Sequence, residues 1–402
     1  MRGTTIAQSI PLLISPILTR IYTPEEFGVF ALFISIVAVF SVIATARYEF
    51  AVLLAKSDED AINVMALGFL VVTFISLLLL FFITFFHGFV TSLLPTSQLD
   101  LWLYFIPLMV FFIGVFNLLN HFNNRKKYYK DIANATILKS IVGASIQLLM
   151  GFMHQGVSGL ISGQVISQFF ANVKLAKNIF KEKILVKTIR ISKMFHQAKK
   201  YKDFPKFQAP HALLNTFSSN IPIYMFSLFF NASIVGLYSL SVRIVFSPLM
   251  ILANASAKVY NQKLSELHHQ KEDVYGFTLR FLKSLLKKII LPFVLIVYFA
   301  PEIFAFVFSQ EWKEAGLYTQ VLSPWLFMIF FTSTISFIPS MLNQQKKALF
   351  LEVLYSFLRV LAIGIGVFYK DVYLGLILFS LVGFCMLFYN ILWMLNSLKK
   401  VD

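Results

Sequence analysis

Twelve apolar runs, most of about 20 residues, follow one another along this chain and are separated by short polar breaks. About 20 apolar residues in a helix cross the hydrocarbon core of a bilayer, where a helix satisfies all of its own backbone hydrogen bonds. The pattern predicts an all-α polytopic membrane protein with about twelve transmembrane helices. The expected helices are Gly3–Thr19, Phe27–Ala55, Ala61–Phe86, Leu101–His121, Ile132–Phe152, Val157–Ala176, Gln208–Phe230, Val235–Tyr260, Leu279–Phe308, Tyr318–Leu342, Leu349–Phe368 and Tyr373–Leu398.

The distribution of charge sets the expected orientation. Only 13% of the residues are charged, against roughly 25% in soluble domains. The net charge of +16 could suggest nucleic acid, but the basic residues occupy the short breaks between apolar runs, so no nucleic-acid partner is expected. Every second break is basic. Because basic loops stay in the cytoplasm, both chain termini are predicted to be cytoplasmic.

The most basic segment divides the chain into two halves of similar length. Eleven Lys and Arg residues lie between Lys174 and Lys206, against Glu182 and Asp203. We expect an N-terminal six-helix lobe at residues 1–177, a basic cytoplasmic linker at 178–206 and a C-terminal six-helix lobe at 207–402.

The two halves resemble each other weakly. Phe27–Leu32 aligns with Val235–Leu240, and Arg125–Lys127 aligns with Gln345–Lys347. Each half has an even number of helices, so both begin on the same side of the membrane. This predicts two lobes related by a parallel pseudo-two-fold repeat, the usual plan of an alternating-access transporter. The alternative is chance similarity between apolar helices.

Four cations lie inside apolar runs: Arg47, Lys139, Arg243 and Arg359. A cation at the bilayer centre costs roughly 2.5–3.5 kcal/mol on insertion scales, so we expect these side chains to face partners or a wet cavity. A net positive cavity favours an anionic substrate such as a phosphate or diphosphate.

Simpler roles remain open for each cation. Arg47 and Lys139 lie near the cytoplasmic ends of their helices, from which long side chains can reach the interface. Glu352 and Arg359 are seven residues apart on one helix face and could form a structural ion pair. Glu49, two residues from Arg47 on the same expected helix, should point elsewhere.

Several kinds of chemistry have no support in the sequence. No phosphate-binding Gly-rich loop is present, so the chain is not expected to hydrolyse ATP. Gly156–Gly159 matches a Gly-x-Ser-Gly protease pattern, but no later helix carries a deep histidine to activate the serine. No metal site or other cofactor is expected. The chain is predicted not to be an enzyme, and a membrane-bound sugar polymerase would need a sizeable external loop that is absent.

Four segments resemble bacterial polysaccharide flippases of the Wzx type: Gly3–Gly28, Ala46–Glu49, Ser57–Ala61 and Gly159–Gln164. This resemblance implies membership of the multidrug/oligosaccharidyl-lipid/polysaccharide exporter superfamily, with two six-helix lobes around a cavity. It also implies transport of an undecaprenyl-diphosphate-linked oligosaccharide, an O-antigen or related polysaccharide repeat unit, from the inner to the outer leaflet by alternating access. The alternative is an ion-coupled multidrug antiporter of the same superfamily.

The resemblance also suggests roles for individual residues. Related lipid II flippases carry arginines at positions that match Arg20, Arg47 and Arg243, which agrees with the cations found by depth. Together with Lys139 and Arg359 these are the expected substrate-binding residues, and Glu49 is a candidate for ion coupling. The implied location is the bacterial cytoplasmic (inner) membrane, in lipopolysaccharide biosynthesis. Membrane lipids, a polysaccharide polymerase and chain-length machinery are candidate partners.

Overall fold

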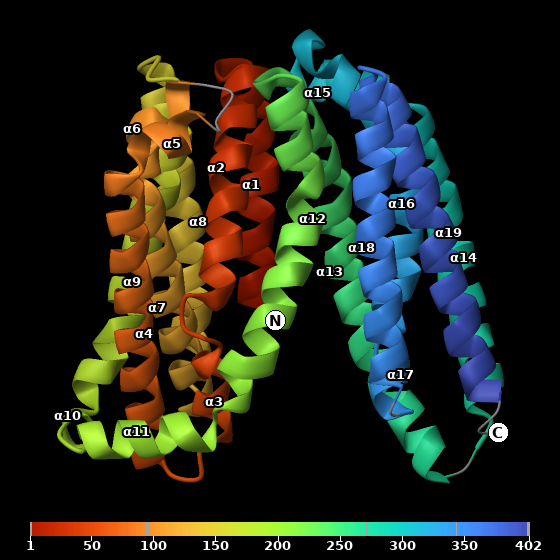
Figure 1. Cartoon of the computed structure of the whole chain (residues 1–402). Coiled ribbons are helices and arrows are strands. Elements are labelled where there is room, and N and C mark those ends of the chain that lie inside the picture. The colour runs from red at the N-terminus through yellow and green to blue at the C-terminus, as the bar shows by residue number, and fades with distance from the viewer. Residues whose placement is uncertain (1, 93–96, 271, 343, 400–402) are drawn as a thin grey trace. The chain divides into compact units, whose positions relative to one another are not determined.

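The computed structural model describes residues 2–92, 97–270, 272–342 and 344–399, which are almost entirely helical (Figure 1). They form two compact units that divide between Gly236 and Leu237. The first unit contains α1 (Arg2–Ile21), α2 (Pro24–Ile43), α3 (Tyr48–Leu54), α4 (Asp58–Phe85), α5 (His87–Ser92), α6 (Asp100–Leu103), α7 (Phe105–Arg125), α8 (Tyr129–Phe152), α9 (Val157–Lys181), α10 (Lys183–Val186), α11 (Ile191–Lys200) and α12 (Ala209–Phe229).

One long helix, α13 (Ala232–Gln270), begins in the first unit and continues through the second. The other helices of the second unit are α14 (Val274–Tyr298), α15 (Ala300–Phe308), α16 (Lys313–Thr334), α17 (Ile338–Met341), α18 (Gln345–Phe368) and α19 (Val372–Lys399).

Eight spans in the described residues are long and apolar enough to cross a membrane, and a ninth is the pair α14 and α15, bent by 67°. Three further long helices, α1, α9 and α12, contain prolines or several polar residues. They bring the long helical segments of the described chain to twelve. The prediction of an all-α polytopic membrane protein is therefore confirmed.

The core of the first unit forms around α2, which is apolar on all sides and therefore buries well among neighbours. Its side chains Val29, Phe33 and Val37 are at most 1% exposed, and α2 packs against α7, α9 and α12. The Tyr224 hydroxyl of α12 donates a hydrogen bond to the Ser35 carbonyl oxygen of α2, at 2.9 Å. Because α12 packs in this way, the compact units divide after α12 rather than at the basic linker. The lobe boundaries expected from the sequence stay a prediction.

The first turns of α2 and α13 cross at two glycines. A Cβ atom at Gly28 would lie 1.7 Å from the Ala232 carbonyl oxygen, and one at Gly236 would lie 1.9 Å from the Pro24 carbonyl oxygen. The contact is reciprocal, because Pro24 and Ala232 each precede their own glycine by four residues. These are the glycines that the internal repeat aligns. Since the two helices meet at their beginnings, both start on the same side of the membrane, as a parallel repeat requires.

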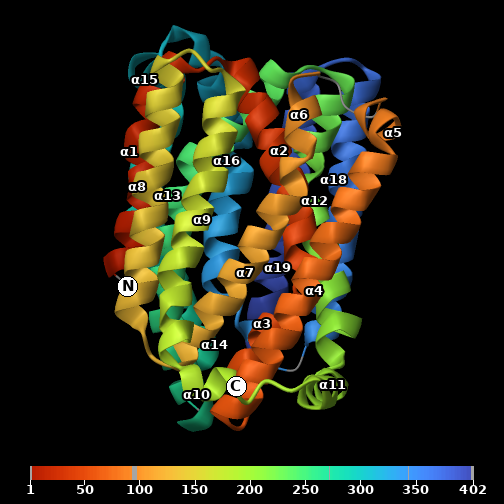
Figure 2. The same ribbon diagram turned by 90° about the vertical axis from the view of Figure 1, so that its left-hand side faces the viewer.

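The basic linker is largely helical. Figures 1 and 2 show α11 lying across the ends of the long helices of the first unit, beside the start of α4. One face of α11 buries Met194 and Gln197, while its other residues are exposed or only partly buried. The linker thus packs one face of α11 against the first unit.

The second unit packs around α16, which contacts α15 and α19. Trp312, just before α16, is fully buried, and Tyr318 is 1% exposed. Trp325 lies edge-on to Phe379 of α19, with ring centroids 4.9 Å apart. Large aromatic side chains thus supply much of the apolar burial on this helix.

Several expected helices have different limits in the structure, and three of them show why. The span expected at Phe27–Ala55 breaks at Ile43, and α3 begins at Tyr48 after a turn. The span expected at Leu279–Phe308 bends between α14 and α15, where Pro301 opens the second helix and disfavours a helical residue before it. The helix expected to end at Tyr260 continues to Gln270, because the following polar residues have no helix breaker.

Candidate functional site

Arg47 lies in the turn between α2 and α3, not inside a continuous helix. Ala46 and Arg47 have positive φ angles of 49° and 64°. In this turn Arg47 Nη1 lies 3.6 Å from Glu49 Oε1, and the guanidinium carbon lies 4.7 Å from the Phe50 ring centroid. Its Nε is buried without a hydrogen-bond partner among the described residues. Arg47 is thus held in place while part of its hydrogen-bonding capacity stays unused.

Glu49 is buried, with 2% of its surface exposed, and accepts a hydrogen bond from the Thr45 hydroxyl. The expectation that Glu49 points away from Arg47 is wrong. It assumed helical spacing, whereas the left-handed backbone at Arg47 turns the two side chains toward each other. The sequence did not indicate the break between α2 and α3, because the turn contains no glycine or proline.

Lys139 is a partly buried cation within α8. Its Nζ lies 5.8 Å from the centroid of the Phe116 ring of α7, and it forms no ion pair with a described residue. The next residue, Ser140, donates a hydrogen bond to the Ala7 carbonyl oxygen of α1 at 2.7 Å. A hydrogen bond thus joins α8 to α1 next to Lys139, but no described carboxylate neutralises the charge of Lys139.

Arg20 lies at the other end of α2 from Arg47. It lies in the last turn of α1, and its Nη1 donates to the Pro16 carbonyl oxygen at 2.8 Å. Between the two arginines stands α2, whose 20 residues span about 30 Å. The structure therefore does not bring Arg20 and Arg47 together.

In the second unit, Arg359 of α18 is 9% exposed and stacks on aromatic rings. Its guanidinium carbon lies 3.6 Å from the Tyr355 ring centroid and 6.0 Å from that of Phe379. No ion pair joins it to Glu352, so the structural pair that the sequence left open does not form in the described structure. Arg359 Nε is buried without a hydrogen-bond partner among the described residues.

Arg243 is a partly buried cation within α13. It has no ion-pair partner in the part of the chain that the structure describes. With Lys139 and Arg359, it makes three buried or partly buried cations within long helices that no described carboxylate neutralises. All three were identified by their depth in apolar runs.

The sequence did not predict an ion-pair network that joins loops of the first unit. Asp58, the first residue of α4, contacts Arg125 Nε at 2.9 Å and Lys126 Nζ at 2.7 Å. Lys126 also lies 3.4 Å from Glu182, to which Tyr128 donates a hydrogen bond at 3.1 Å. Burial lowers the pKa of Lys126, but the two carboxylates outweigh it and raise that pKa above its usual value. These loops are joined to each other rather than freely solvated.

Asn63 attaches the linker to α4. It is fully buried, and its Nδ2 donates to the carbonyl oxygens of Glu59 and Thr188 at 2.8 and 3.3 Å. Its Oδ1 accepts a hydrogen bond from the Arg190 backbone N–H at 3.0 Å. Lys193 of α11 also pairs with Glu59. A single polar residue in an apolar run was the only sequence signal for this contact.

A family profile described as "Polysaccharide biosynthesis protein" matches residues 17–316, about three quarters of the chain. The chain belongs to this family. The expected family assignment is thereby confirmed. No match was found among curated protein sequences.

Several solved structures share the fold of this polysaccharide biosynthesis protein. A structure titled lipid II flippase MurJ, inward closed conformation, has a TM-score of 0.77 and 14% identity, covering 99% of this chain and 88% of that one. An outward-facing multidrug resistance MATE transporter of the MOP superfamily has a TM-score of 0.61 and 14% identity, covering 100% and 94%. A MOP superfamily transporter from Pyrococcus furiosus has a TM-score of 0.59 and 16% identity, covering 99% and 94%. These similarities confirm the expected two-lobe fold class.

Proposed function

We propose that this protein is a flippase that moves an undecaprenyl-diphosphate-linked oligosaccharide from the inner to the outer leaflet of a bacterial inner membrane by alternating access. Its family supports a role in polysaccharide biosynthesis. Its fold is that of transporters, including a structure titled lipid II flippase. The transported unit would be an O-antigen or a related polysaccharide repeat unit, and membrane lipids would surround its lipid tail.

The observation that carries this proposal is the set of unneutralised cations within the long helices. Lys139, Arg243 and Arg359 have no carboxylate partner in the described structure. Placing one such cation at the bilayer centre costs roughly 2.5–3.5 kcal/mol of free energy. A diphosphate supplies the missing anionic partner, so binding it would offset the cost that the empty protein bears. These cations would bind the diphosphate that all such lipid-linked substrates share. Other residues would distinguish one sugar unit from another.

The remaining candidate residues take distinct roles in this mechanism. Arg47, with its unused Nε, would contact the diphosphate from the cytoplasmic side of the first unit. Arg20, about 30 Å away along α2, would act at the opposite side of the membrane. Glu49, buried beside Arg47, is the candidate for coupling to an ion gradient, because protonation would remove the negative charge next to that arginine. A polysaccharide polymerase and chain-length machinery would act on the delivered product.

A second candidate function is ion-coupled multidrug export, because MATE transporters have the same fold. Organic cations would meet electrostatic repulsion near three unneutralised basic side chains, so we favour the anionic substrate. The same fold fits both functions, and transport measurements separate them.

The test is transport by full-length protein in proteoliposomes that contain fluorescent undecaprenyl-diphosphate oligosaccharide. An impermeant quencher reports how much label has crossed the bilayer. Arg47→Gly and Arg243→Met each remove one cation: glycine tolerates the φ of 64° at position 47, and methionine suits a helix in an apolar setting. Because Arg47→Gly also leaves buried Glu49 without its ion pair, thermal melting must first show that this variant is folded. We expect each variant to lose at least about tenfold in rate, equivalent to one charge-assisted hydrogen bond. Lys313→Gln, at an exposed position, is the matched control and should be unchanged.

If both variants transported the labelled lipid at the wild-type rate, these two arginines would have no role in binding the diphosphate. Export of organic cations against a proton or sodium gradient, with no movement of the lipid-linked label, would establish the antiporter instead.

A further inference from the structure

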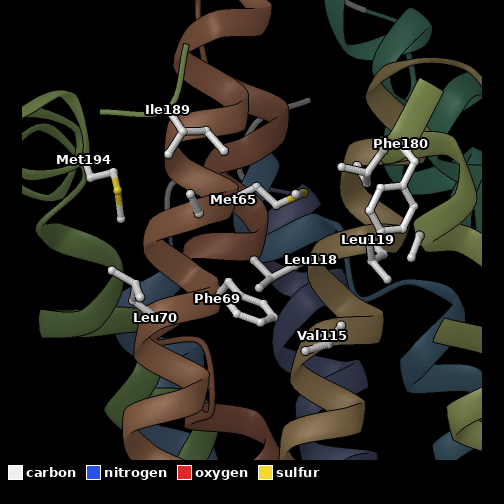
Figure 3. A pocket seen from close by; sticks show the side chains of 12 residues that line it. Met65, Phe69, Leu70, Val115, Leu118, Leu119, Phe180, Ile189 and Met194 are labelled. Carbon is white, nitrogen blue, oxygen red and sulfur yellow. The ribbon is translucent and has the colours of Figure 1, made fainter. Parts of the chain in front are cut away.

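An apolar cavity of about 380 Å³ lies within the first unit, between α4, α7, α9 and the linker (Figure 3). Figure 3 shows Phe69 of α4 and Leu118 of α7 between Met194 of α11 and Phe180 of α9. Ala176 of α9 also lines it, and all twelve of its lining residues are apolar. The volume matches about a dozen methylene-sized groups, if each occupies about the space of a water molecule in the liquid. A cavity of this size and composition suits part of a hydrocarbon chain.

The chain next to the cavity alternates apolar and basic residues. From the end of α9 to the start of α11, Phe180 and Ile184 are 72% and 84% exposed, and Ile191 is exposed as well. Such exposure is unfavourable in water but suits side chains that enter the boundary between lipid headgroups and acyl chains. The linker therefore has the character of a segment that lies in the membrane interface.

Four exposed cations alternate with these apolar side chains: Lys181, Lys183, Lys187 and Arg190. None of them forms an ion pair with a residue that the structure describes, whereas Lys193 and Lys200, farther along, pair with carboxylates of α4. Unpaired positive charge thus adjoins the cavity-lining residues Phe180 and Ile189 along the chain, as it also occurs at Lys199 and Lys202 farther on. Anionic lipid headgroups are the complementary charge at the cytoplasmic surface of a membrane.

We propose that this cavity and the four cations form a binding site for one anionic phospholipid of the inner leaflet. An acyl chain enters the cavity between Phe69 and Phe180, and its phosphate contacts the basic residues of the linker. Phe180 belongs to both parts, because it lines the cavity and lies next to Lys181. The lipid is a resident ligand that holds the linker against the first unit, not the transported substrate.

The geometry distinguishes this occupant from other ligands. The cavity presents no polar side chain to a sugar or a soluble metabolite. Its lining comes only from the first unit and includes none of the cations proposed to bind the diphosphate. The linker is fastened beside it through buried Asn63, so the cavity has a built wall and not a mobile loop.

The test is native mass spectrometry of the full-length protein in detergent, with phosphatidylglycerol and phosphatidylethanolamine of matched acyl chains. We expect wild type to retain one phosphatidylglycerol at least about tenfold more tightly than phosphatidylethanolamine, given the contribution of each basic residue near an anionic surface. Replacing Lys181, Lys183, Lys187 and Arg190 together by Gln should abolish this preference. Ala176→Phe should fill the cavity and release both lipids.

Matched controls separate this site from general attraction. A second variant with the same charge change, in which four exposed lysines of the second unit become Gln, should keep the lipid preference; these are Lys258, Lys283, Lys287 and Lys288. Leu149→Phe, on an exposed apolar position of α8, should also retain the lipid.

Three results would overturn the proposal: equal retention of the two lipids by wild type, unchanged retention by Ala176→Phe, or displacement of phosphatidylglycerol by undecaprenyl phosphate. The last would assign the cavity to the lipid tail of the substrate. Because the readout is lipid retention, these results are independent of whether the protein flips oligosaccharide.

Discussion

Lys139 is expected to lower the stability of the fold while it supports transport. It lies within α8 near Phe116, with no carboxylate partner among the described residues. Lys139→Met keeps a similar length and removes the unneutralised charge. We expect the free energy of unfolding to increase, by up to about 2.5–3.5 kcal/mol, while transport of the lipid-linked oligosaccharide falls. Thermal melting in detergent and the proteoliposome assay measure the two effects.

Lys139→Arg is the control, because it keeps the cation and should retain the stability of wild type and part of its transport. A lower melting temperature for Lys139→Met would instead mean that the lysine stabilises the fold, for example by reaching the membrane surface.

At the residue scale, the sequence predicted which positions carry unusual charge but not what surrounds them. Arg47, Lys139, Arg243 and Arg359 could be found because a cation in an apolar run is rare and costly. Their contacts depend on side chains distant in the sequence, such as Phe116 beside Lys139. The ion pair of Arg47 with Glu49 depends on the positive φ angle at Arg47. The sequence does not indicate this angle, because no glycine occupies the turn.

At the element scale, the crossing of α2 and α13 depends on the absence of a side chain. Gly28→Ala would place a Cβ atom 1.7 Å from the Ala232 carbonyl oxygen, so the two helix backbones would have to separate. Overpacking of this kind costs typically 1–3 kcal/mol. We therefore expect a clearly lower melting temperature, measured by the thermal loss of monodisperse protein in detergent.

Gly88→Ala, in the short helix α5, is the matched control, since an added Cβ there meets no atom within 4 Å. It should leave the melting temperature nearly unchanged. Equal stability of Gly28→Ala and wild type would show that the two helices can separate without penalty.

The attachment of the linker gives a second prediction about elements. Asn63→Ala would leave the Arg190 backbone N–H and the Thr188 carbonyl oxygen without their partner on α4. An unsatisfied buried polar group costs about 1–3 kcal/mol, so the linker should detach more often. Limited trypsin digestion should cut the Lys- and Arg-rich linker several-fold faster than in wild type.

Asn124→Ala, an exposed position at the end of α7, serves as the control and should be cut at the wild-type rate. The same slow cleavage in Asn63→Ala would mean that the ion pairs of α11, including Lys193 with Glu59, suffice to hold the linker.

Helices were easier to predict than their ends. Nine spans of the described chain follow from apolar length, a strong local signal, and the other three long helices, α1, α9 and α12, also lie where helices were predicted. The turn between α2 and α3 and the extension of α13 to Gln270 could not be expected, since neither is marked by a helix breaker. The packing of α12 on α2, which sets where the compact units divide, depends on contacts between segments about 190 residues apart.

For the whole molecule, the distribution of Lys and Arg makes the most general prediction, the orientation of the chain in the membrane. Cysteine substitutions in a Cys385→Ser background test it, because Cys385 is the only cysteine. An impermeant maleimide should label Lys313→Cys and Lys370→Cys from outside intact cells, and Lys202→Cys and Lys346→Cys only after the membrane is opened. All four positions are exposed in the structure, so a failure to react reports the membrane barrier and not burial. Labelling of Lys202→Cys from outside would reverse the predicted orientation and with it the direction proposed for transport, since Arg47 and the linker would then face away from the cytoplasm.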